Sequence, residues 1–284
     1  MEHPLTVSFF ILKQCNFNCR FCYSTFPDVG RRCSNAEAES IIRCLAGAGV
    51  QKVTFVGGEP TLHPHIAGLV DLAHRYGMVT VVVSNGARLP QLLDACPNTL
   101  DWVGLDIDSI HEDVEVRLGR GTGGHVARTI ELTDECHRRG IRLKLNSVVT
   151  SLAWQEDWSE VIRQIQPDRW KAFQVLPVAG QNDGIDDLLI TPEQFKAWAD
   201  RHAHLGVIPE TNDLMSNTYA LIDPSGRFYE STPAGHVYGK SILEVGVAEA
   251  WASVEFREEQ FKARGGIYDW GGEGALTPLG NRGS

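Results

Sequence analysis

The residues Cys15-Asn16-Phe17-Asn18-Cys19-Arg20-Phe21-Cys22 directly follow an apolar stretch at residues 6–13 that has the composition of a β-strand. The chain has seven Cys, and three of them lie in this one loop, whereas the other four are scattered. An odd number of Cys with three so closely spaced favours a metal site over disulfides. The loop after the first strand is therefore the first candidate site.

Strand-like and helix-like segments alternate from this loop onward, which predicts right-handed βαβ units around a parallel sheet. We expect an α/β fold: six such units in residues 1–177, curved into a partial (β/α)6 barrel. Residues 178–284, which include a loop rich in Gly, Asp and Asn and a helix opened by Thr191-Pro192, form an extension packed on it. The predicted strands are 6–13, 52–56, 80–84, 102–106, 142–149 and 171–176, and the predicted helices are 35–48, 65–76, 89–95, 124–139 and 153–166.

Composition limits the classes of function. There are 26 Lys and Arg against 36 Asp and Glu, a net charge of −10, which argues against direct nucleic-acid binding over a broad basic surface. No apolar run approaches the ~20 residues that span a bilayer, and no secretory signal precedes the first strand. We expect no membrane partner and a cytoplasmic protein.

The Cys triplet has a specific chemical meaning. Four-iron clusters normally take four Cys ligands, so Cys15, Cys19 and Cys22 would leave one iron open to a substrate or cofactor. Structural zinc is the alternative, but tetrahedral zinc usually draws on two ligand pairs, and no second CxxC or HxxxH follows.

Further polar motifs end the later strands, where ligands of parallel α/β folds bind. Gly57-Gly58-Glu59-Pro60 follows the second strand, Ser84-Asn85-Gly86 ends the third, and Asn146-Ser147 lies in the fifth. Glycines allow a ligand to approach the backbone, and the Glu59 carboxylate could accept a hydrogen bond from an ammonium group. An ordinary turn is the alternative for the first two motifs, and a satisfied amide at the end of a strand is the alternative for Asn146.

CxxxCxxC with Phe21 before the last Cys, followed by the GGEP motif, resembles the signature of the radical S-adenosylmethionine (radical SAM) superfamily. The resemblance implies a [4Fe–4S] cluster on Cys15, Cys19 and Cys22, and S-adenosylmethionine that is reductively split to a 5′-deoxyadenosyl radical. It also implies that the cofactor contacts Phe21, Tyr23, Gly57, Gly58, Glu59, Ser84, Asn85, Arg120 and Asn146.

A narrower resemblance runs from about Thr6 to Trp270 and is to the viperin-like nucleotide dehydratases in their prokaryotic form. It rests on ordered blocks such as Leu118-Gly119-Arg120-Gly121, Lys144-Leu145-Asn146-Ser147-Val148 and Arg264-Gly265-Gly266-Ile267-Tyr268. In that family the radical removes the ribose 4′ hydrogen of a nucleoside triphosphate and water leaves from the 3′ carbon. The 3′-deoxy-3′,4′-didehydro product terminates viral RNA chains, so an antiviral lyase is implied, with an electron donor such as flavodoxin or ferredoxin.

A triphosphate of roughly four negative charges needs convergent cations in this acidic chain. The candidates are Lys144, Arg169, Lys171 and Arg264, of which the two lysines share one face of their strands by alternation. Solvated surface charge is the alternative for each. Gly265-Gly266 could offer N–H groups to phosphate, and Glu210 would suit ribose hydroxyls. By the resemblance, Tyr219 faces the substrate and relays the last hydrogen atom.

Two departures from the family bear on the substrate. Arg31 and Arg32 stand where animal members place a phosphate-binding Lys, and Ser231-Thr232-Pro233-Ala234-Gly235 replaces their Cys-Arg-Lys-Gly stretch beside the base. The base therefore stays open between CTP, UTP and GTP.

Other functions also remain open on the sequence alone. One is a radical SAM enzyme acting on a peptide or another nucleotide, although many of these carry further Cys clusters, and no Cys follows Cys136 here. The other is a non-catalytic iron–sulfur protein, which would need neither the GGEP motif nor the cations.

Overall fold

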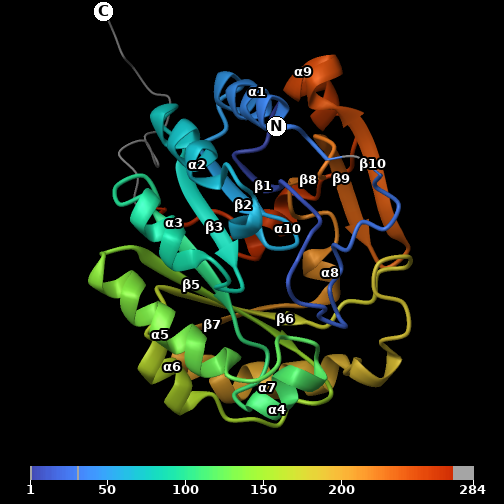
Figure 1. Cartoon of the computed structure of the whole chain (residues 1–284). Helices are drawn as coiled ribbons and strands as arrows, with labels where there is room; N and C mark the ends of the chain where they lie inside the picture. The colour runs from blue at the N-terminus through green and yellow to red at the C-terminus, as the bar shows by residue number, and fades with distance from the viewer. Residues whose placement is uncertain (1, 31, 271–284) are drawn as a thin grey trace, which may run out of the picture.

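A computed structural model describes residues 2–30 and 32–270, and it places them around one curved sheet of ten strands (Figure 1). The strand order is β10-β9-β8-β1-β2-β3-β4-β5-β6-β7. The strands are β1 (Thr6–Phe10), β2 (Lys52–Val56), β3 (Val79–Ser84), β4 (Trp102–Asp106), β5 (Arg142–Val149), β6 (Arg169–Gln174), β7 (Val207–Glu210), β8 (Leu221–Ile222), β9 (Arg227–Thr232) and β10 (Gly235–Ser241).

The strands β1 to β7 pair in parallel and in chain order, which confirms the predicted α/β fold. Helices connect them and lie around the outside of the sheet (Figure 1). The longer helices are α1 (Asn35–Gly47), α2 (Ile66–Arg75), α3 (Leu89–Ala95), α5 (His125–Arg138), α6 (Ser159–Ile165), α7 (Pro192–His202) and α9 (Ile242–Trp251); the shorter ones are α4 (Glu112–Arg117), α8 (Asn212–Met215) and α10 (Glu258–Ala263).

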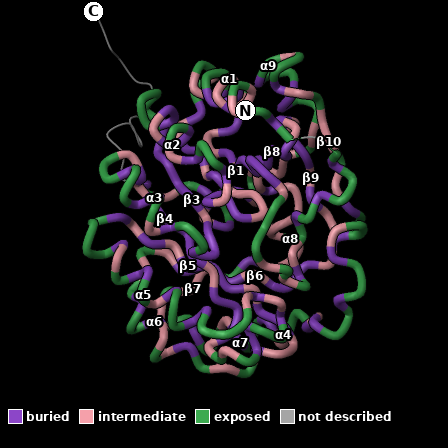
Figure 2. The backbone as a smooth tube through the Cα atoms, viewed as in Figure 1, coloured by how far each residue is buried: buried purple, intermediate pink, exposed green. Residues whose placement is uncertain are grey.

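Alternation along each strand divides the side chains between two environments. Phe9, Phe55 and Leu145 point outward and are fully buried in the apolar core shared with the helices. Their strand neighbours point to the concave face. Buried residues accordingly follow the strands through the middle of the molecule, while exposed residues follow the outer turns of the helices (Figure 2).

The predicted helix starts are explained by their caps. Ser34 and Glu37 form a capping box at α1, and Thr191 and Gln194 form another at α7, with Pro192 in the first turn. The helix predicted at residues 153–166 starts only at Ser159, because residues 151–155 form turns.

The chain beyond residue 177 contributes to the sheet itself. β7 continues the parallel order after β6, whereas β8 pairs in parallel with β1 at the other side and leads into the antiparallel β9–β10 hairpin. The sequence did not predict these four strands or α4, α8, α9 and α10. The first predicted strand, in turn, ends at Phe10 rather than Lys13.

Candidate active site

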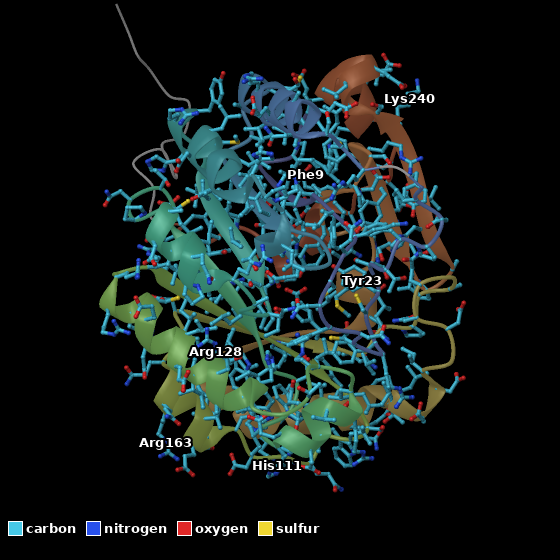
Figure 3. All side chains as sticks on the ribbon, in the orientation of Figure 1. Phe9, Tyr23, His111, Arg128, Arg163 and Lys240 are labelled. Atoms are coloured by element: carbon cyan, nitrogen blue, oxygen red, sulfur yellow. The ribbon has the colours of Figure 1, made fainter. Side chains whose placement is uncertain are left out.

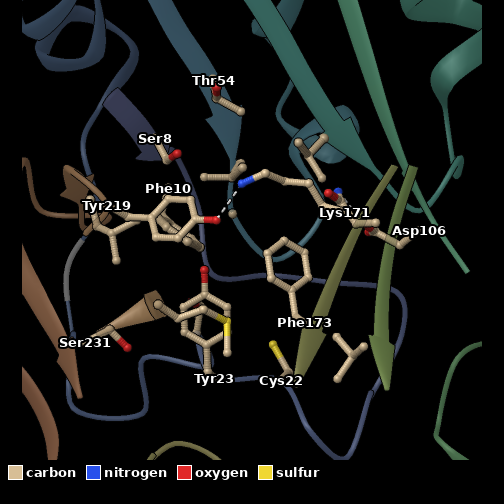
Figure 4. A pocket seen from close by; sticks show the side chains of 18 of the residues that line it. Ser8, Phe10, Cys22, Tyr23, Thr54, Asp106, Lys171, Phe173, Tyr219 and Ser231 are labelled. Carbon is tan, nitrogen blue, oxygen red and sulfur yellow. Dashed lines mark hydrogen bonds between the residues drawn. The ribbon is translucent and has the colours of Figure 1, made fainter. Parts of the chain in front are cut away.

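The concave face of the sheet lines a deep cavity of about 560 Å³, a size suited to a small-molecule site. Every second residue of the strands reaches it, since alternate side chains share one face. The lining residues include Ser8 and Phe10 of β1, Lys52 and Thr54 of β2, Lys144 and Asn146 of β5, and Lys171 and Phe173 of β6. Figure 4 shows Phe10, Phe173 and Lys171 turned toward the same space, with Cys22 and Tyr23 at one end.

The Cys loop lies at the carboxyl end of the strands and is fixed to the segment after α4. The backbone N–H of Asn18 donates to the Gly119 carbonyl at 3.2 Å, and that of Arg20 donates to the Leu118 carbonyl at 2.9 Å. Gly119 has a positive φ of 84°, and a Cβ there would lie 2.1 Å from the Asn18 oxygen. A glycine is therefore required at this contact.

Cys15, Cys19 and Cys22 all line the cavity and form no disulfide. Burial, together with the neighbouring Asp108, Cys22 and Cys15, raises the pKa of the Cys19 thiol to about 12 against the effect of Arg120. Thiolates in this setting need a bound cation. Within residues 2–30 and 32–270, no three His, Cys, Asp or Glu side chains converge as they would around a single ion, whereas a four-iron cluster holds its thiolates on separate corners. The three residues fit such a cluster.

Gly57 and Gly58 meet the backbone that leads into the Cys loop rather than open space. The Gly58 N–H donates to the Leu12 carbonyl at 2.8 Å, and the Glu59 N–H donates to the Gln14 carbonyl at 2.8 Å. A Cβ on Gly58 would lie 2.2 Å from the Gln14 oxygen. These glycines pack the GGEP turn against the Cys loop, which is a different reason from the predicted approach of a ligand.

Glu59 lies at the cavity with 1% of its surface exposed. Its Oε1 accepts hydrogen bonds from the Thr61 N–H (2.9 Å), the Thr61 hydroxyl (2.5 Å) and Ser84 Oγ (2.7 Å). Among the described residues, Oε2 accepts only from the Asn85 N–H (2.7 Å). A carboxylate has about four acceptor positions, so Oε2 retains capacity toward the cavity. The predicted contact with the cofactor's ammonium thus stays a prediction.

Ser84 and Asn85 divide their roles. Ser84 does not line the cavity; its hydroxyl donates to Glu59 and accepts from the Gly86 N–H at 2.9 Å. Asn85 does line the cavity, and its side-chain amide donates to Asn16 Oδ1 at 2.9 Å and to Cys15 Sγ at 3.6 Å. Asn85 therefore orients one of the three thiols.

Arg120 lines the cavity but is already paired. Its Nε donates to Asp108 at 2.5 Å and lies 3.5 Å from Glu115, and its Nη1 lies 3.7 Å from Asp106. Burial and the neighbouring Asp108 raise the pKa of Glu115 to about 8. The predicted contact of Arg120 with the cofactor would have to compete with these acidic side chains.

Asn146 is a strong candidate for a ligand contact. Its side-chain amide donates to Asp106 at 2.9 Å, but its buried Oδ1 has no hydrogen-bond partner and belongs to a cavity-lining residue. A buried acceptor without a partner is costly, so a ligand donor suits it. The aromatic residues Phe21 and Tyr23 also line the cavity, and Tyr23, which is labelled in Figure 3, is 38% exposed.

The amino ends of the strands carry the cations. Lys144 faces the cavity with no hydrogen bond or ion pair among the described residues. Burial, together with Arg169 and Arg264, lowers the pKa of Lys144 to about 8 against the effect of Glu210 and Asp106. The first residue of β2, Lys52, also reaches this end, and burial together with Lys144, Arg169 and Arg264 lowers its pKa well below the usual value.

Lys171, Glu210 and Tyr219 form one buried network. Lys171 and the Tyr219 hydroxyl both donate short hydrogen bonds to Glu210, and Lys171 Nζ lies 3.0 Å from the Tyr219 oxygen. Burial raises the pKa of Glu210, but Lys171 and Arg264 outweigh this and hold it below its usual value. Glu210 is fully buried and does not line the cavity, so it orients Lys171 and Tyr219 rather than presenting a free carboxylate to ribose hydroxyls.

Arg264 and Arg169 complete the cationic end. Arg264 stacks 3.6 Å from the centre of the Tyr219 ring and donates to the Thr218 carbonyl at 2.8 Å. Arg169 Nη2 donates to the Gly265 carbonyl at 2.6 Å. The N–H groups of Gly265 and Gly266 donate to the Lys262 and Phe261 carbonyls at 3.0 and 2.9 Å, which corrects the expectation that they are offered to phosphate.

Sequence reasoning missed some cavity residues and misplaced others. Lys52 lines the cavity although the sequence did not single it out, whereas Arg32 is exposed and does not line the cavity, and Arg31 lies outside the described residues. The signal that could have found Lys52 was its place as the first residue of a predicted strand, on the same face as the other cavity residues of that strand. Ser231 does line the cavity, and its buried hydroxyl has no partner.

Comparison with known proteins shows the family of this chain. The model of the Radical SAM superfamily matches residues 10–163. An S-adenosylmethionine-dependent nucleotide dehydratase of Flammeovirga pacifica is 40% identical over 93% of this chain and 96% of its own. Enzymes of the same name from a Thermoplasmatales archaeon and from Oncorhynchus mykiss are 31% and 32% identical, over 92% and 94% of this chain and 94% and 81% of their own.

Solved structures agree with the fold. Streptococcus suis SuiB bound to S-adenosylmethionine superposes with a TM-score of 0.68 at 16% identity, covering 94% of this chain and 68% of that one. Coproporphyrinogen III oxidase from Escherichia coli, described as a radical SAM enzyme, gives 0.58 at 13% identity, covering 94% and 75%. At these identities the similarity concerns the fold. The predicted [4Fe–4S] cluster and S-adenosylmethionine are confirmed as cofactors, and the chain belongs to the S-adenosylmethionine-dependent nucleotide dehydratases of the radical SAM superfamily.

Proposed function

We propose that the nucleotide is a ribonucleoside triphosphate, CTP, UTP or GTP, and that the product is its 3′-deoxy-3′,4′-didehydro form. The observation that carries the proposal is the polarity of the cavity. The Cys loop occupies the carboxyl end of the strands, and five cations gather toward the other end: Lys52, Lys144, Arg169, Lys171 and Arg264.

The charges of this end fit a polyphosphate. Glu210 is the carboxylate among the five cations, and both of its oxygens already accept hydrogen bonds from Lys171, Tyr219 and Arg264. When a bound anion keeps all the lysines protonated, a net charge of about +4 faces the roughly four negative charges of a triphosphate. Desolvation disfavours the charged form of the buried lysines when they are alone. An anion bound beside these lysines would stabilise their charged form.

Phosphates held among these cations place the ribose between them and the Cys loop. The bound cluster and S-adenosylmethionine supply a 5′-deoxyadenosyl radical at that loop. The proposed reaction passes the 4′ hydrogen atom to this radical, releases the 3′-hydroxyl with a proton as water, and needs one further electron. Tyr219 contacts the same space, and its hydroxyl is held between Lys171 and Glu210, so it is the proposed relay in the last step.

Neutral side chains remain for the base. Met215, Leu176 and Ser231 line the cavity, and the Ser231 hydroxyl lacks a partner. A hydroxyl both donates and accepts, so this wall accommodates either a carbonyl or an amino group of a base. The base therefore stays open between CTP, UTP and GTP in the proposal.

The biological role proposed is antiviral: the product lacks the 3′-hydroxyl that a polymerase extends, so it would end viral RNA chains. An electron donor such as flavodoxin or ferredoxin would serve the reaction, and the cytoplasm is its proposed location, because thiol ligands need a reducing compartment. No helix in residues 2–30 and 32–270 is long and apolar enough to span a membrane.

The test is an anaerobic assay of the reduced, cluster-loaded protein with S-adenosylmethionine and each of the four ribonucleoside triphosphates in turn. Mass spectrometry should find a triphosphate that has lost one water, in step with 5′-deoxyadenosine. The corresponding nucleoside should be a poor substrate, because it has no phosphates. Equal turnover of nucleoside and triphosphate, or 5′-deoxyadenosine without a dehydrated nucleotide, would contradict the proposal.

Lys171→Ala tests the phosphate site within the same assay. The nucleotide concentration needed for half-maximal dehydration should rise by about tenfold or more, since a hydrogen bond between charged groups is lost. The slow cleavage of S-adenosylmethionine without nucleotide should persist, because other residues build the cofactor site. Lys196→Ala is the matched control: this lysine lies on α7 and pairs with Asp200 at the surface. An unaltered half-maximal nucleotide concentration in Lys171→Ala would contradict the assignment of Lys171 to the phosphate site.

A further inference from the structure

The segment from Gly265 to Trp270 lies across the cationic end of the cavity. It is held there from several strands. The Trp102 indole N–H of β4 donates to the Trp270 carbonyl at 2.9 Å, and Arg142 of β5 donates to the Asp269 carbonyl at 3.2 Å. Trp270 is 1% exposed and packs with Val79, Val81 and Trp102.

Within this segment, Tyr268 contacts two cations that come from distant strands. The Arg169 guanidinium lies 4.0 Å from the centre of its ring, and Lys52 Nζ lies 4.5 Å from the same centre. Lys52 also donates to the Tyr268 hydroxyl at 3.2 Å. Lys52 starts β2 and Arg169 starts β6, and β3, β4 and β5 separate these strands in the sheet. The electron-rich face of one aromatic ring therefore connects two like charges across the curved sheet.

These contacts have an electrostatic consequence. Two cations that converge without an anion repel each other, and each can relax by moving its long side chain away. The Tyr268 ring offsets part of that repulsion and fixes both head groups. The ring is itself fixed, because it packs edge-on against Trp102 and Trp270, with centroid distances of 5.8 and 5.9 Å.

We infer that Tyr268 is a positioning residue that holds Lys52 and Arg169 together at the amino end of the barrel, so that they bind the terminal phosphate of the substrate. The inference rests on the proposed function, since it assumes that phosphates occupy the cationic end. Lys52 and Arg169 belong to the first positions of their strands, farthest along the chain direction from the Cys loop. A monophosphate bound near the ribose would fall short of them, so the Tyr268 contacts select for the number of phosphates.

The experiment compares Tyr268→Leu and Tyr268→Phe with the unaltered protein, and uses Tyr76→Leu as a control at an exposed tyrosine. Inorganic tripolyphosphate is the first probe, because its binding, measured by calorimetry, requires no turnover. Tyr268→Leu should weaken that binding by about tenfold, since both ring contacts are lost. Tyr268→Phe keeps the ring and loses only the hydroxyl, and should weaken it by about threefold or less.

The second readout is the KM for the nucleoside tri-, di- and monophosphate of the best base. Tyr268→Leu should raise the KM for the triphosphate by about tenfold, leave that for the monophosphate within about twofold, and leave kcat unchanged. An equal loss for all three nucleotides would mean a merely structural role and overturn the inference. An equal loss for Tyr268→Phe and Tyr268→Leu would overturn the part assigned to the ring, because the hydroxyl that accepts from Lys52 is lost in both. If tripolyphosphate binding responds as expected while no nucleotide is dehydrated, the proposed function fails and the positioning role stands.

Discussion

The clearest perturbation of the cationic end is Lys52→Met. Lys52 is 7% exposed, and burial and three neighbouring cations lower its pKa well below the usual value. Methionine keeps the length and the apolar contacts of the stem against Tyr268 and Trp270. The substitution removes the charge alone. It should therefore weaken nucleotide binding and, at the same time, stabilise the empty protein.

The magnitudes follow from the contacts. A hydrogen bond to a charged group contributes about 1.5 to 3 kcal/mol, so the KM for the triphosphate should rise roughly ten- to 150-fold. Removing a buried cation that has no acidic partner relieves a desolvation penalty. A gain of about 1 kcal/mol would raise Tm by roughly 2 to 4 °C for a chain of this size. The two changes have opposite signs, which a general loss of packing would not produce.

The assay pairs thermal unfolding of the apoprotein with steady-state dehydration and with the 5′-deoxyadenosine released in the absence of nucleotide. That nucleotide-independent release should not change, because Lys52 lies at the far end of the cavity from the Cys loop. Lys196→Met serves as the control, since this side chain is exposed on α7. A lower Tm together with an unchanged KM would refute the reasoning, because Lys52 would then be a structural residue outside the phosphate site.

Three further outcomes are expected. Cys19→Ala should abolish the cluster and the cleavage of S-adenosylmethionine, as measured by iron content and 5′-deoxyadenosine, because three thiolates are the minimum that leaves one iron open; retained iron with full cleavage would contradict the ligand assignment. Glu59→Gln should keep the cluster but weaken S-adenosylmethionine binding by about tenfold or more, and unchanged affinity would leave Glu59 a purely structural acceptor for Thr61, Ser84 and Asn85. Tripolyphosphate affinity should fall as the pH rises through about 8, because the Lys144 ammonium, whose pKa is near 8 in the empty site, binds the anion only when protonated; a flat profile between pH 7 and 9, measured by calorimetry, would show that Lys144 takes no part.

The sequence predicted the part of the fold in which local pattern and tertiary structure agree. Strands β2 and β4 coincide with the predicted segments, and α3 has the predicted bounds. Alternation also placed Lys144 and Lys171 on the cavity side, where both are found. It failed for β8, a strand of two residues whose existence depends on pairing with β1 and β9 rather than on its own composition.

The unpredicted part of the site depends on contacts between residues far apart in the chain. Lys52 and Tyr268 are separated by 216 positions and meet only because the C-terminal segment crosses the sheet. Glu210 illustrates the other limit: its type and position suggested a ligand contact, but the burial that directs it to Lys171, Tyr219 and Arg264 is a property of the folded network. The pairing of Arg120 with Asp108 and Glu115 is likewise tertiary.

The cationic end also explains how an acidic protein with a net charge of −10 can select a polyanion. A buried cation without an anion is disfavoured, and the fold moderates this cost with one carboxylate, Glu210, and two aromatic faces, Tyr219 and Tyr268. Neither ring carries charge, so the positive potential stays available to a ligand. A polyanion that neutralises it restores the ordinary protonation of the lysines, and its contacts with several cations at once offset the cost of this proton uptake. The proposed selectivity for a triphosphate would therefore arise within this buried cluster of cations, and it does not require the outer surface to be basic.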